Sequence, residues 1–397
     1  MTRATFSSFR AGRRARWVWA GTTRGVDVEL TDQYRPGAFL FATPERALLA
    51  DQPRHVLSEK DSDALSVQVS DALAEYGGIA VGALPYDNTG EAHVLLPTSV
   101  TWSGPIRPGT HQAALPPGHQ VTPEPLPQEY ERQVAKALTL LETGELGKVV
   151  LARTLRIDLD GPVDMRRVLA SLAAMNTHGY TVATPLPTPG VTLVSASPEL
   201  LVRRTGTEFV SRPLAGSQPR GKDPVEDRAN AQRLLASRKD HDEHRWVVEA
   251  EVEALRPFCR RLDVPRTPSL LSTPSVWHLA TKITGELADP AVTALTLAAA
   301  LHPTPAVCGS PTSAARGAIA QLESFDRGFY TGAVGWVDAA GDGEWAVAIR
   351  SADVTDRSLR LYAGAGIVDG SVPGLELAET SAKFQTLLRG MGLDLTL

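Results

Sequence analysis

The stretch that most constrains the fold covers residues 362–383 and reads YAGAGIVDGSVPGLELAETSAK. An apolar, strand-like run ends at its start, the small residues 364–366 predict a turn, and a helical pattern follows. The helix places three charged side chains on one face, those of Glu376, Glu379 and Lys383. Carboxylates suit a metal, and the lysine and the turn amides suit an anion, so a bridged metal–anion ligand is one interpretation. The other is a solvated helix face after a glycine turn.

The composition is that of an ordinary soluble protein. The 397 residues can bury a large core as one domain or two, and 43% of them are hydrophobic. The net charge of −5 gives no reason to expect a nucleic acid as partner, and no apolar run is long enough to span a bilayer. Cys259 and Cys308 lie far apart without metal-site spacing, which fits a reduced, cytoplasmic setting.

The N-terminus is basic, with many arginines and no acidic residue before Asp27. This composition is typical of a transit peptide. The run Trp17-Val18-Trp19 is instead typical of a short strand, and no apolar signal-peptide core follows it. We therefore expect an uncleaved, partly ordered and variable N-terminal segment over residues 1–37.

The first half of the chain predicts strands more than helices. Residues 38–101 carry short apolar runs typical of strands, with one short helix among them, and the Pro- and Gly-rich residues 103–127 predict a long surface connection. A helix is expected from Pro127 to Gly144. The alternating run that begins at Lys148 predicts a strand, on a face of small side chains that could line a cavity. A solvated lysine at a strand start is the simpler interpretation.

A carboxylate stands inside the apolar block VTLVSASPELLVRR, directly after a proline that predicts a kink. This carboxylate, Glu199, is expected either to pair with Arg203 or Arg212 or to stay protonated for proton donation. The strands that follow end in Gly216-Ser217, where the backbone could approach a ligand closely.

A long helix is expected from about Asp223 to Leu255, opened by a capping box. Its KDHDEH run places Asp240 and Glu243 on one face, which is a second acidic pair at helical spacing. The histidines there lack the H-E-x-x-H spacing of a zinc site. Oxygen ligands from two helices favour magnesium, which binds one or two carboxylates, waters and an anionic substrate.

Three further features predict a pocket. His278 lies in a strand and is expected to be buried and hydrogen-bonded. The segment HPTPAVCGSP is apolar and rigid, so it is expected to form a pocket wall. Arg350 ends a strongly apolar run, where a guanidinium needs an anion and its fork suits a carboxylate.

In this order along the chain, the sequence contains KVVLAR, SPELLV, PLAGS, KDHDEH, WHLATKITGEL, LHPTPAVCG, FDRGFYTGAVGW, AIRSADV, AGAGIV and AETSAK. These motifs resemble those of the chorismate-utilising enzymes, and within that family the isochorismate synthase branch. The resemblance runs from about Ala38 to Gly392. It implies an α+β fold, with one large catalytic domain over residues 38–397 in which two long antiparallel sheets pack at the core and helices lie outside.

The resemblance also implies a site with Mg²⁺ as cofactor and chorismate as substrate. Glu243 and Glu379 match the magnesium ligands, and Asp240 and Glu376 match positions that act through metal-bound water. The implied substrate-binding positions are Gly216, Ser217, His278, Ala306, Tyr330, Arg350, Gly364, Ala365, Gly366 and Lys383. At position 330 some members carry phenylalanine instead.

The implied reaction is the isomerisation of chorismate to isochorismate, in which water attacks C2 and the C4 hydroxyl leaves. Lys148 matches the general base for water, and Glu199 would be the general acid. Branches that use ammonia usually lack this lysine, and salicylate synthases usually carry threonine where Ala306 stands. Isochorismate of this kind supplies siderophore, menaquinone or other secondary-metabolite biosynthesis.

Three alternatives stay open at this point. A salicylate synthase would also eliminate pyruvate. An anthranilate or aminodeoxychorismate synthase component would work with a glutaminase. A non-catalytic chorismate-binding regulator would need neither acid nor base. For the isochorismate synthase we expect a cytoplasmic monomer with no glutaminase partner.

Overall fold

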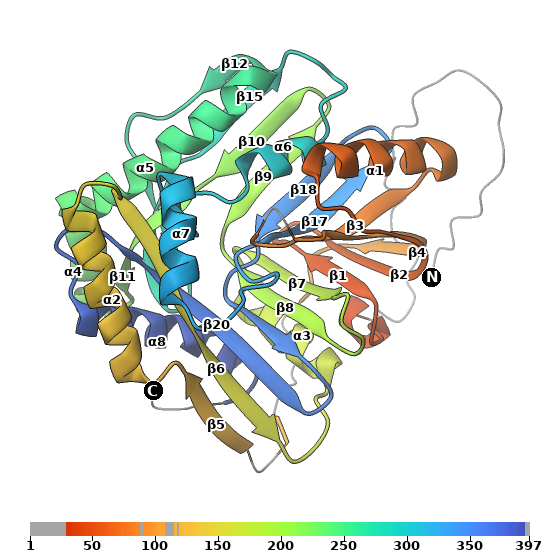
Figure 1. The fold of residues 1–397 in the computed structure, drawn as a ribbon. Helices are drawn as coiled ribbons and strands as arrows, with labels where there is room; N and C mark the ends of the chain where they lie inside the picture. Colours follow the sequence, from red (N-terminus) through yellow and green to blue (C-terminus); the bar gives the residue numbers. More distant parts are fainter. Residues whose placement is uncertain (1–28, 88–89, 108–114, 117–118, 394–397) are drawn as a thin grey trace.

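The computed structural model describes residues 29–393 except 88–89, 108–114 and 117–118 (Figure 1). In this part of the chain, 17 strands pair edge to edge in one continuous antiparallel ladder, and three more form a small separate sheet. Helices lie outside the strands, so the expected α+β fold with large antiparallel sheets is confirmed. The two expected long sheets correspond to the two halves of this ladder. The halves meet where β1 pairs with β2.

The first half contains the strands that carry the predicted lysine and the GAG segment. In pairing order it comprises β5 (His119–Glu124), β6 (Lys148–Leu159), β20 (Ser358–Ile367), β19 (Ser351–Val354), β8 (Thr192–Ser197), β7 (Tyr180–Pro185) and β1 (Phe39–Ala42), with the short β16 (Gly309–Ser310) beside the start of β6. Its outer face buries Leu155, Leu359 and Val194 against α3 (Met165–Met175) and α8 (Pro373–Gly390).

The second half continues through β2 (Ala47–Leu57), β4 (His93–Ser103), β3 (Ile79–Leu84), β17 (Ala333–Asp338), β18 (Gly343–Val347), β9 (Leu200–Thr205), β10 (Glu208–Arg212), β15 (Ile283–Leu287) and β12 (Cys259–Asp263). Its outer face packs on α1 (Ser62–Tyr76), α6 (Ala294–Leu301) and the C-terminal part of α5 (Arg238–Leu255), which a short 3-10 turn (Arg256–Phe258) follows.

The inner faces of the two halves pack on each other. Phe39 and Val182 from the first half share one buried cluster with Val334 and Trp336 from the second. Burial of such a side chain stabilises the fold by roughly 1.5–3 kcal/mol each. This contact holds the two sheets together.

The small sheet has the order β11 (Leu214–Pro219), β14 (Val276–Ala280), β13 (Ser269–Ser272) and packs against α4 (Pro224–Ala236) and α5. The single long helix expected from Asp223 to Leu255 is wrong, because α4 ends at Ala236 and α5 begins at Arg238. Ser237 between them is extended, and its side chain accepts a hydrogen bond from the Asp240 amide. A new N-cap therefore interrupts the helical pattern.

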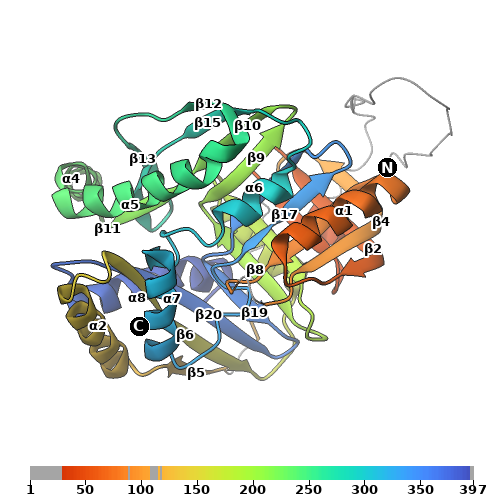
Figure 2. The same cartoon turned by 45° about the horizontal axis from the view of Figure 1, so that its top comes forward.

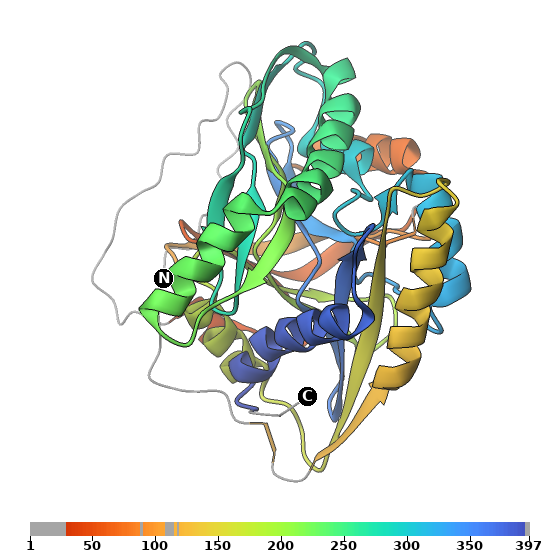
Figure 3. The same ribbon diagram turned by 90° about the vertical axis from the view of Figure 1, so that its left-hand side faces the viewer.

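The helix that begins at Pro127 is confirmed as α2 (Pro127–Glu142), with α7 (Thr312–Leu322) as its neighbour. Both pack on β6 and β20 through Tyr130, Leu151 and Ile367. Figure 3 shows α2 and α8 beside these two strands. The elements around β6 and β20 thus form one group, and those around α5 form a second, as Figure 2 shows.

Two expectations about loops are wrong. The Pro- and Gly-rich residues 103–127 were expected to form only a surface connection, but β5 lies within them and pairs with β6. Gly364, Ala365 and Gly366 do not form a turn; they continue β20 and pair with Ala152, Leu151 and Val150 of β6. In both cases pairing with β6 outweighs the local preference of glycine and proline for turns.

The N-terminal strand expected around Trp17 lies outside the described residues. A 3-10 turn, Leu30–Gln33, begins the described part, and Leu30 and Tyr34 are buried in the first core cluster. The boundary expected at residue 37 stays a prediction. No helix in the described ranges is both long and apolar enough to cross a membrane.

Candidate active site

One cavity collects most of the residues selected from the sequence. Its lining residues come from α5, β11 and β14 in one of the two groups of elements and from α8, β6 and β20 in the other. Its lining includes Glu199, Gly216, Ser217, Glu243, His278, Ala306, Tyr330, Arg350, Gly364, Gly366, Glu379 and Lys383. Lys148 and Asp240 lie directly behind this lining, and Glu376 lies one helical turn from Glu379.

Ala365 is placed differently from its two glycine neighbours. Its side chain belongs to the outer core between α2 and β6. The Gly364 carbonyl accepts a hydrogen bond from Lys383, so that edge of β20 faces the cavity. Alternation along the strand then directs the Gly366 backbone to the same edge and the Ala365 backbone toward β6.

Lys148 is completely buried, so its interpretation as a solvated lysine at a strand start is wrong. Its Nζ lies 2.9 Å from Glu243 Oε1, but the contact is poorly aligned, and no directed hydrogen bond forms in the described structure. A buried amine with spare donor capacity is costly unless it meets a ligand. Lys148 is therefore a candidate for direct contact with substrate or water.

Glu199 lies between β8 and β9 with only 2% of its surface exposed. Burial raises its pKa to about 7, while the Leu214 amide and the charges of Lys148 and Lys383 act in the opposite direction. The amide donates to Oε1 at 3.4 Å. In the described residues neither suggested arginine forms an ion pair with Glu199, and Arg203 pairs with Glu344 instead. The alternative of a protonated acid therefore fits better.

The charged face of α8 closes the cavity on the opposite side. Lys383 Nζ lies 2.7 Å from Glu379 Oε1 and donates to the Gly364 carbonyl at 2.7 Å. Glu376, at the start of the same helix, lies 3.3 Å from Lys239 Nζ. Burial and the neighbouring Glu379 raise the pKa of Glu376, against the influence of Lys239. The face predicted from the sequence thus carries alternating paired charges and is not simply solvated.

Four carboxylates from α5 and α8 influence one another. Burial raises the pKa of Asp240, and the charges of Glu243 and Glu379 add to the effect. Burial also acts to raise the pKa of Glu243, but Lys148, Lys383 and Lys239 outweigh it and hold that pKa below its usual range. Glu243 is therefore ionised, and a cation between the helices would relieve the remaining repulsion.

Among the described residues, no three or more His, Cys, Asp or Glu side chains stand together as a ready metal site. This does not conflict with magnesium, which takes one or two carboxylates and completes its shell with waters and an anionic substrate. Glu243 and Glu379 supply such a pair from two helices. A Cβ atom at Gly366 would lie 2.5 Å from Glu243 Oε1, so glycine is required for that carboxylate to reach its place. The donor set fits Mg²⁺.

A second glycine is required where β11 passes α5. Gly216 has a φ of 78°, and an added Cβ would lie 3.0 Å from Asp240 Cβ. The next residue, Ser217, contacts His278 Nδ1 through its hydroxyl at 3.1 Å. The sequence prediction that the backbone bends close to functional groups at this position fits this geometry.

Arg350 is a buried residue of the cavity lining, with 4% of its surface exposed and a φ of 50°. Its Nη2 donates to His278 Nε2 at 3.1 Å, and its Nη1 donates to Thr386 Oγ1 at 3.2 Å. Burial lowers its pKa to about 10. Because Arg350 donates to Nε2, the proton of His278 lies on Nδ1 and faces Ser217.

His278 is buried and hydrogen-bonded, as expected. Burial and the charges of Arg350 and Lys383 hold its pKa well below the usual value, so the ring is neutral. Neither neutral His278 nor Thr386 neutralises the guanidinium. Within the described part of the chain Arg350 has no carboxylate in ion-pair contact, which leaves its charge available to an anionic ligand.

The apolar wall of the cavity contains Ala306 and Tyr330. The Tyr330 ring stacks on Tyr362 at a centroid distance of 4.8 Å. An added Cβ at Gly364 would lie 3.0 Å from the Tyr330 hydroxyl. The predicted pocket wall at residues 302–311 is present where it contains Ala306 and Val307.

Sequence reasoning missed Lys239 and Thr386. Lys239 stands directly before Asp240 in the KDHDEH run, so a search for cations beside the acidic pair would have found it. Thr386 lies three residues after Lys383 on α8, and helical spacing could have placed it on the same face. Its partner Arg350 comes from a distant strand end, which no local pattern connects to α8.

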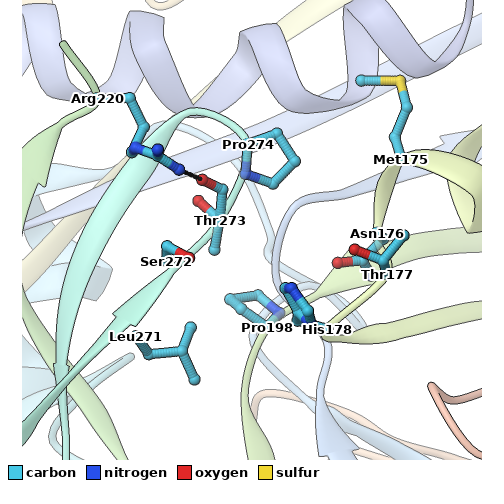
Figure 4. A pocket seen from close by; sticks show the side chains of 10 residues that line it. All are labelled: Met175, Asn176, Thr177, His178, Pro198, Arg220, Leu271, Ser272, Thr273 and Pro274. Carbon is cyan, nitrogen blue, oxygen red and sulfur yellow. Dashed lines mark hydrogen bonds between the residues drawn. The ribbon is translucent and has the colours of Figure 1, made fainter. Parts of the chain in front are cut away.

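A second cavity lies on the other side of Pro198 and is shown in Figure 4. There Arg220 donates to the Thr273 carbonyl at 3.0 Å and is held by Asp227 through two bonds of 2.7 Å. This guanidinium is therefore already paired. The cavity that contains Glu199 and Arg350 offers an acid and a guanidinium without an ion-pair partner in the described residues, and it is the better candidate for the active site.

Comparison with known proteins agrees with this geometry. Residues 108–392 match the family model described as chorismate binding enzyme. The chain is 50% identical over 382 residues to the isochorismate synthase DhbC of Bacillus subtilis, covering 92% of this chain and 96% of that one. It is 42% identical over 325 residues to the isochorismate synthase EntC of Escherichia coli, covering 79% of this chain and 81% of that one.

Solved structures extend the comparison to the fold. DhbC from Bacillus anthracis superposes with a TM-score of 0.88 at 43% identity, over 92% of this chain and 99% of that one. Anthranilate synthase component I from Streptococcus pneumoniae has a TM-score of 0.72 at 21% identity, over 86% of this chain and 92% of that one, and shares the fold. The family match, the similarity over most of the chain and the cavity agree, and the chain belongs to the chorismate-binding enzyme family.

Proposed function

We propose that the chain is an isochorismate synthase, an isomerase that converts chorismate to isochorismate by water attack at C2 and loss of the C4 hydroxyl. The similarity to DhbC and EntC over most of the chain supports this reaction. The observation that carries it is the pairing of a buried lysine with a buried carboxyl of raised pKa around one cavity. An exchange of hydroxyl groups needs both a base and an acid.

Glu199 is the general acid. A pKa of about 7 keeps much of this carboxyl protonated at neutral pH, so it can donate to the departing C4 hydroxyl. The Leu214 amide holds Oε1 and leaves the other carboxyl oxygen to carry the proton toward the substrate. Burial thus provides the protonation state of the acid, and the Leu214 amide provides its orientation.

Lys148 is the general base, and in its uncharged form it accepts a proton from the attacking water. Its position behind Glu243 and Gly366 keeps bulk water away from the amine. The poorly aligned contact to Glu243 leaves donor and acceptor capacity for a reacting water. This role also favours the reaction with water over the reaction with ammonia.

The two carboxylates of chorismate are bound by different groups of the cavity. Glu243 and Glu379 would hold Mg²⁺, with Asp240 and Glu376 acting through water. When bound, the ion neutralises and orients the ring carboxylate. Arg350, supported by His278 and Thr386, binds the pyruvyl carboxylate with its planar fork. Lys383 and the edge of β20 at Gly364 and Gly366 complete the polar side.

Incubation of the chain with chorismate and Mg²⁺, followed by chromatographic separation, tests the proposal. The expected product is isochorismate. Lys148→Met should abolish its formation, whereas Lys136→Met, a change at an exposed lysine on α2, should leave the rate unchanged. Absence of isochorismate with the wild-type chain, or equal rates for the two variants, would contradict the proposed reaction or the proposed base.

A further inference from the structure

A buried arginine outside the proposed catalytic groups makes an unusually complete set of contacts. Arg327 lies between α7 and β17 with 3% of its surface exposed. Nε and Nη2 form a fork onto the Glu323 carboxylate at 2.8 and 2.5 Å. The remaining donors reach the carbonyl of Val150 at 2.8 Å, the carbonyl of Val307 at 2.8 Å and the hydroxyl of Thr331 at 3.4 Å.

These contacts close a gap in the sheet. On the edge of β6 away from β20, β16 pairs with Lys148 and Val149, and β5 pairs only from Thr154 onward. Between them, the Val150 carbonyl accepts from Arg327, and the Ala152 amide donates to Glu323 Oε1 at 2.7 Å. An ion pair of side chains therefore occupies the place of a missing strand and satisfies backbone groups that would otherwise be buried without partners.

The groups that the pair holds are also the apolar wall of the cavity. Val150, Val307, Tyr330 and Thr331 all line it. The guanidinium lies 5.8 Å from the Tyr330 ring centroid on one side and 4.5 Å from the Tyr86 ring centroid on the other. One planar group thus connects β6, the segment that contains Ala306 and Val307, and the turn that carries Tyr330.

Arg327 keeps its positive charge. Burial acts to lower its pKa, but the adjacent Glu323 outweighs burial and raises the pKa above the usual value. The guanidinium therefore remains protonated. A lysine could keep the charge but not the fork that reaches Glu323, Val150 and Val307 together.

We propose that Arg327 and Glu323 are positioning residues that fix the wall formed by Val150, Val307 and Tyr330 against the substrate ring. The inference rests on the proposed function, because it requires chorismate to occupy this cavity. Movement of this wall would shift the ring relative to Lys148 and Glu199, and a displacement near 1 Å can cost about a hundredfold in rate.

Arg327→Lys tests the proposal against a matched control. Arg204 is equally buried and donates to Asp342 at 2.8 Å and to the carbonyls of Ala340 and Pro290 at 2.9 Å, but none of these residues lines the cavity. We expect both Arg→Lys variants to lower Tm. Only Arg327→Lys should lower kcat/KM for chorismate, by about tenfold or more.

Two outcomes would overturn the positioning role. One is a folded Arg327→Lys with kcat/KM within about twofold of the wild type, and the other is an equal loss of kcat/KM in Arg204→Lys. Should Arg327→Lys fail to fold, Glu323→Gln decides, because glutamine keeps an acceptor for the Ala152 amide and removes half of the fork. It should lower kcat/KM in the same direction, and an unchanged value would overturn the role.

Chorismate affinity separates failure of this inference from failure of the proposed function. Calorimetry with chorismate and Mg²⁺ should give a weaker Kd for Arg327→Lys than for the wild type and Arg204→Lys. A wild-type chain that binds chorismate without forming isochorismate would contradict the reaction but not the positioning role. Equal Kd and equal kcat/KM for wild type and Arg327→Lys would contradict the positioning role alone.

Discussion

Two buried ion pairs in this molecule differ in how completely they are satisfied. Arg327 and Glu323 form a fork with two hydrogen bonds, and both side chains also hold backbone groups of β6. Lys148 and Glu243 approach to 2.9 Å, but the lysine makes no directed hydrogen bond in the described structure. The first pair lies behind the cavity wall, whereas in the second Glu243 lines the cavity and Lys148 lies directly behind Glu243.

The difference distinguishes a buried ion pair that fixes the structure from one that has groups left to contact a ligand. A buried charge whose partners are all present contributes to a fixed geometry. A buried charge with missing partners makes the protein less stable unless a ligand supplies them. Arg350 also lacks a charged partner in the described residues, because it donates to the neutral groups Thr386 and His278. In the proposed reaction, Arg350 is the cation that a substrate carboxylate would contact, and Lys148 is the amine that would contact the attacking water.

The largest effect is expected on the charged side of the cavity. Glu379→Gln should abolish turnover and leave the fold intact, because Glu379 would supply one of two carboxylate ligands of magnesium while its helix is held by other contacts. Steady-state rates and circular dichroism measure both effects. Full activity in the presence of EDTA would show that the carboxylates serve another purpose.

Glu199→Gln is expected to lower the rate by roughly two to four orders of magnitude, the usual contribution of general acid catalysis. Glutamine keeps the shape and the acceptor for the Leu214 amide but has no acidic proton. Single-turnover kinetics measure the chemical step. If the loss is below about tenfold, Glu199 has a structural role and the assignment of the acid is wrong.

Replacing the cation of each ion pair should lower the free energy of unfolding by different amounts, because the Arg327–Glu323 pair makes more hydrogen bonds than the Lys148–Glu243 pair. Arg327→Met leaves the carboxylate and two carbonyls without their donor, and we expect a loss of about 3–5 kcal/mol in the free energy of unfolding. Lys148→Met removes a cation whose contact with Glu243 is poorly aligned, and Glu243 stays near Lys383 and Lys239, so we expect a smaller loss than for Arg327→Met. Urea unfolding compares them, and equal losses would contradict the distinction.

A smaller effect is expected with pH. The raised pKa of Glu199 means that the acid form is present below about pH 7 and lost above it. The rate should therefore fall by about tenfold per pH unit above that point. Because the folded state binds this proton more tightly, the stability that Glu199 contributes is complete below its ordinary pKa and is lost as pH rises through 7.

The comparison variant for this pH effect is Glu199→Gln, which has no titrating group at that position. Its residual rate should not show the decline above pH 7, and its unfolding free energy should depend less on pH between about 5 and 7. A decline that persists in the variant would place the titration on another group.

The sequence predicted much of the site because its residues occur at local spacings. Glu376, Glu379 and Lys383 share a helix face, and Glu199 stands alone within an apolar block. The roles of Lys148 and Ala306 came from resemblance to a family and stay predictions. Burial of Lys148 was the reverse of the local expectation, because it depends on α5 and β20 covering the start of β6.

The fold class was predictable, but several boundaries were not. Local preferences predicted a turn at Gly364–Gly366 and a loop before Pro127. Both predictions were wrong, because β20 and β5 pair with β6. The break at Ser237 had a local signal, since a serine three residues before Asp240 is a typical N-cap spacing. Arg327 had a local signal only for its pairing with Glu323, four residues earlier, because its other partners are backbone carbonyls of distant segments.

The most direct test of the central claim is a time course with chorismate and Mg²⁺, in which lactate dehydrogenase and NADH report pyruvate. We predict isochorismate as the released product, with no salicylate and little pyruvate at neutral pH. A change of one methyl-sized group near Ala306 alters such a preference by only about 1–3 kcal/mol, so slight leakage is compatible with the claim. Stoichiometric pyruvate with salicylate fluorescence from the earliest points, or anthranilate on adding ammonium, would contradict it.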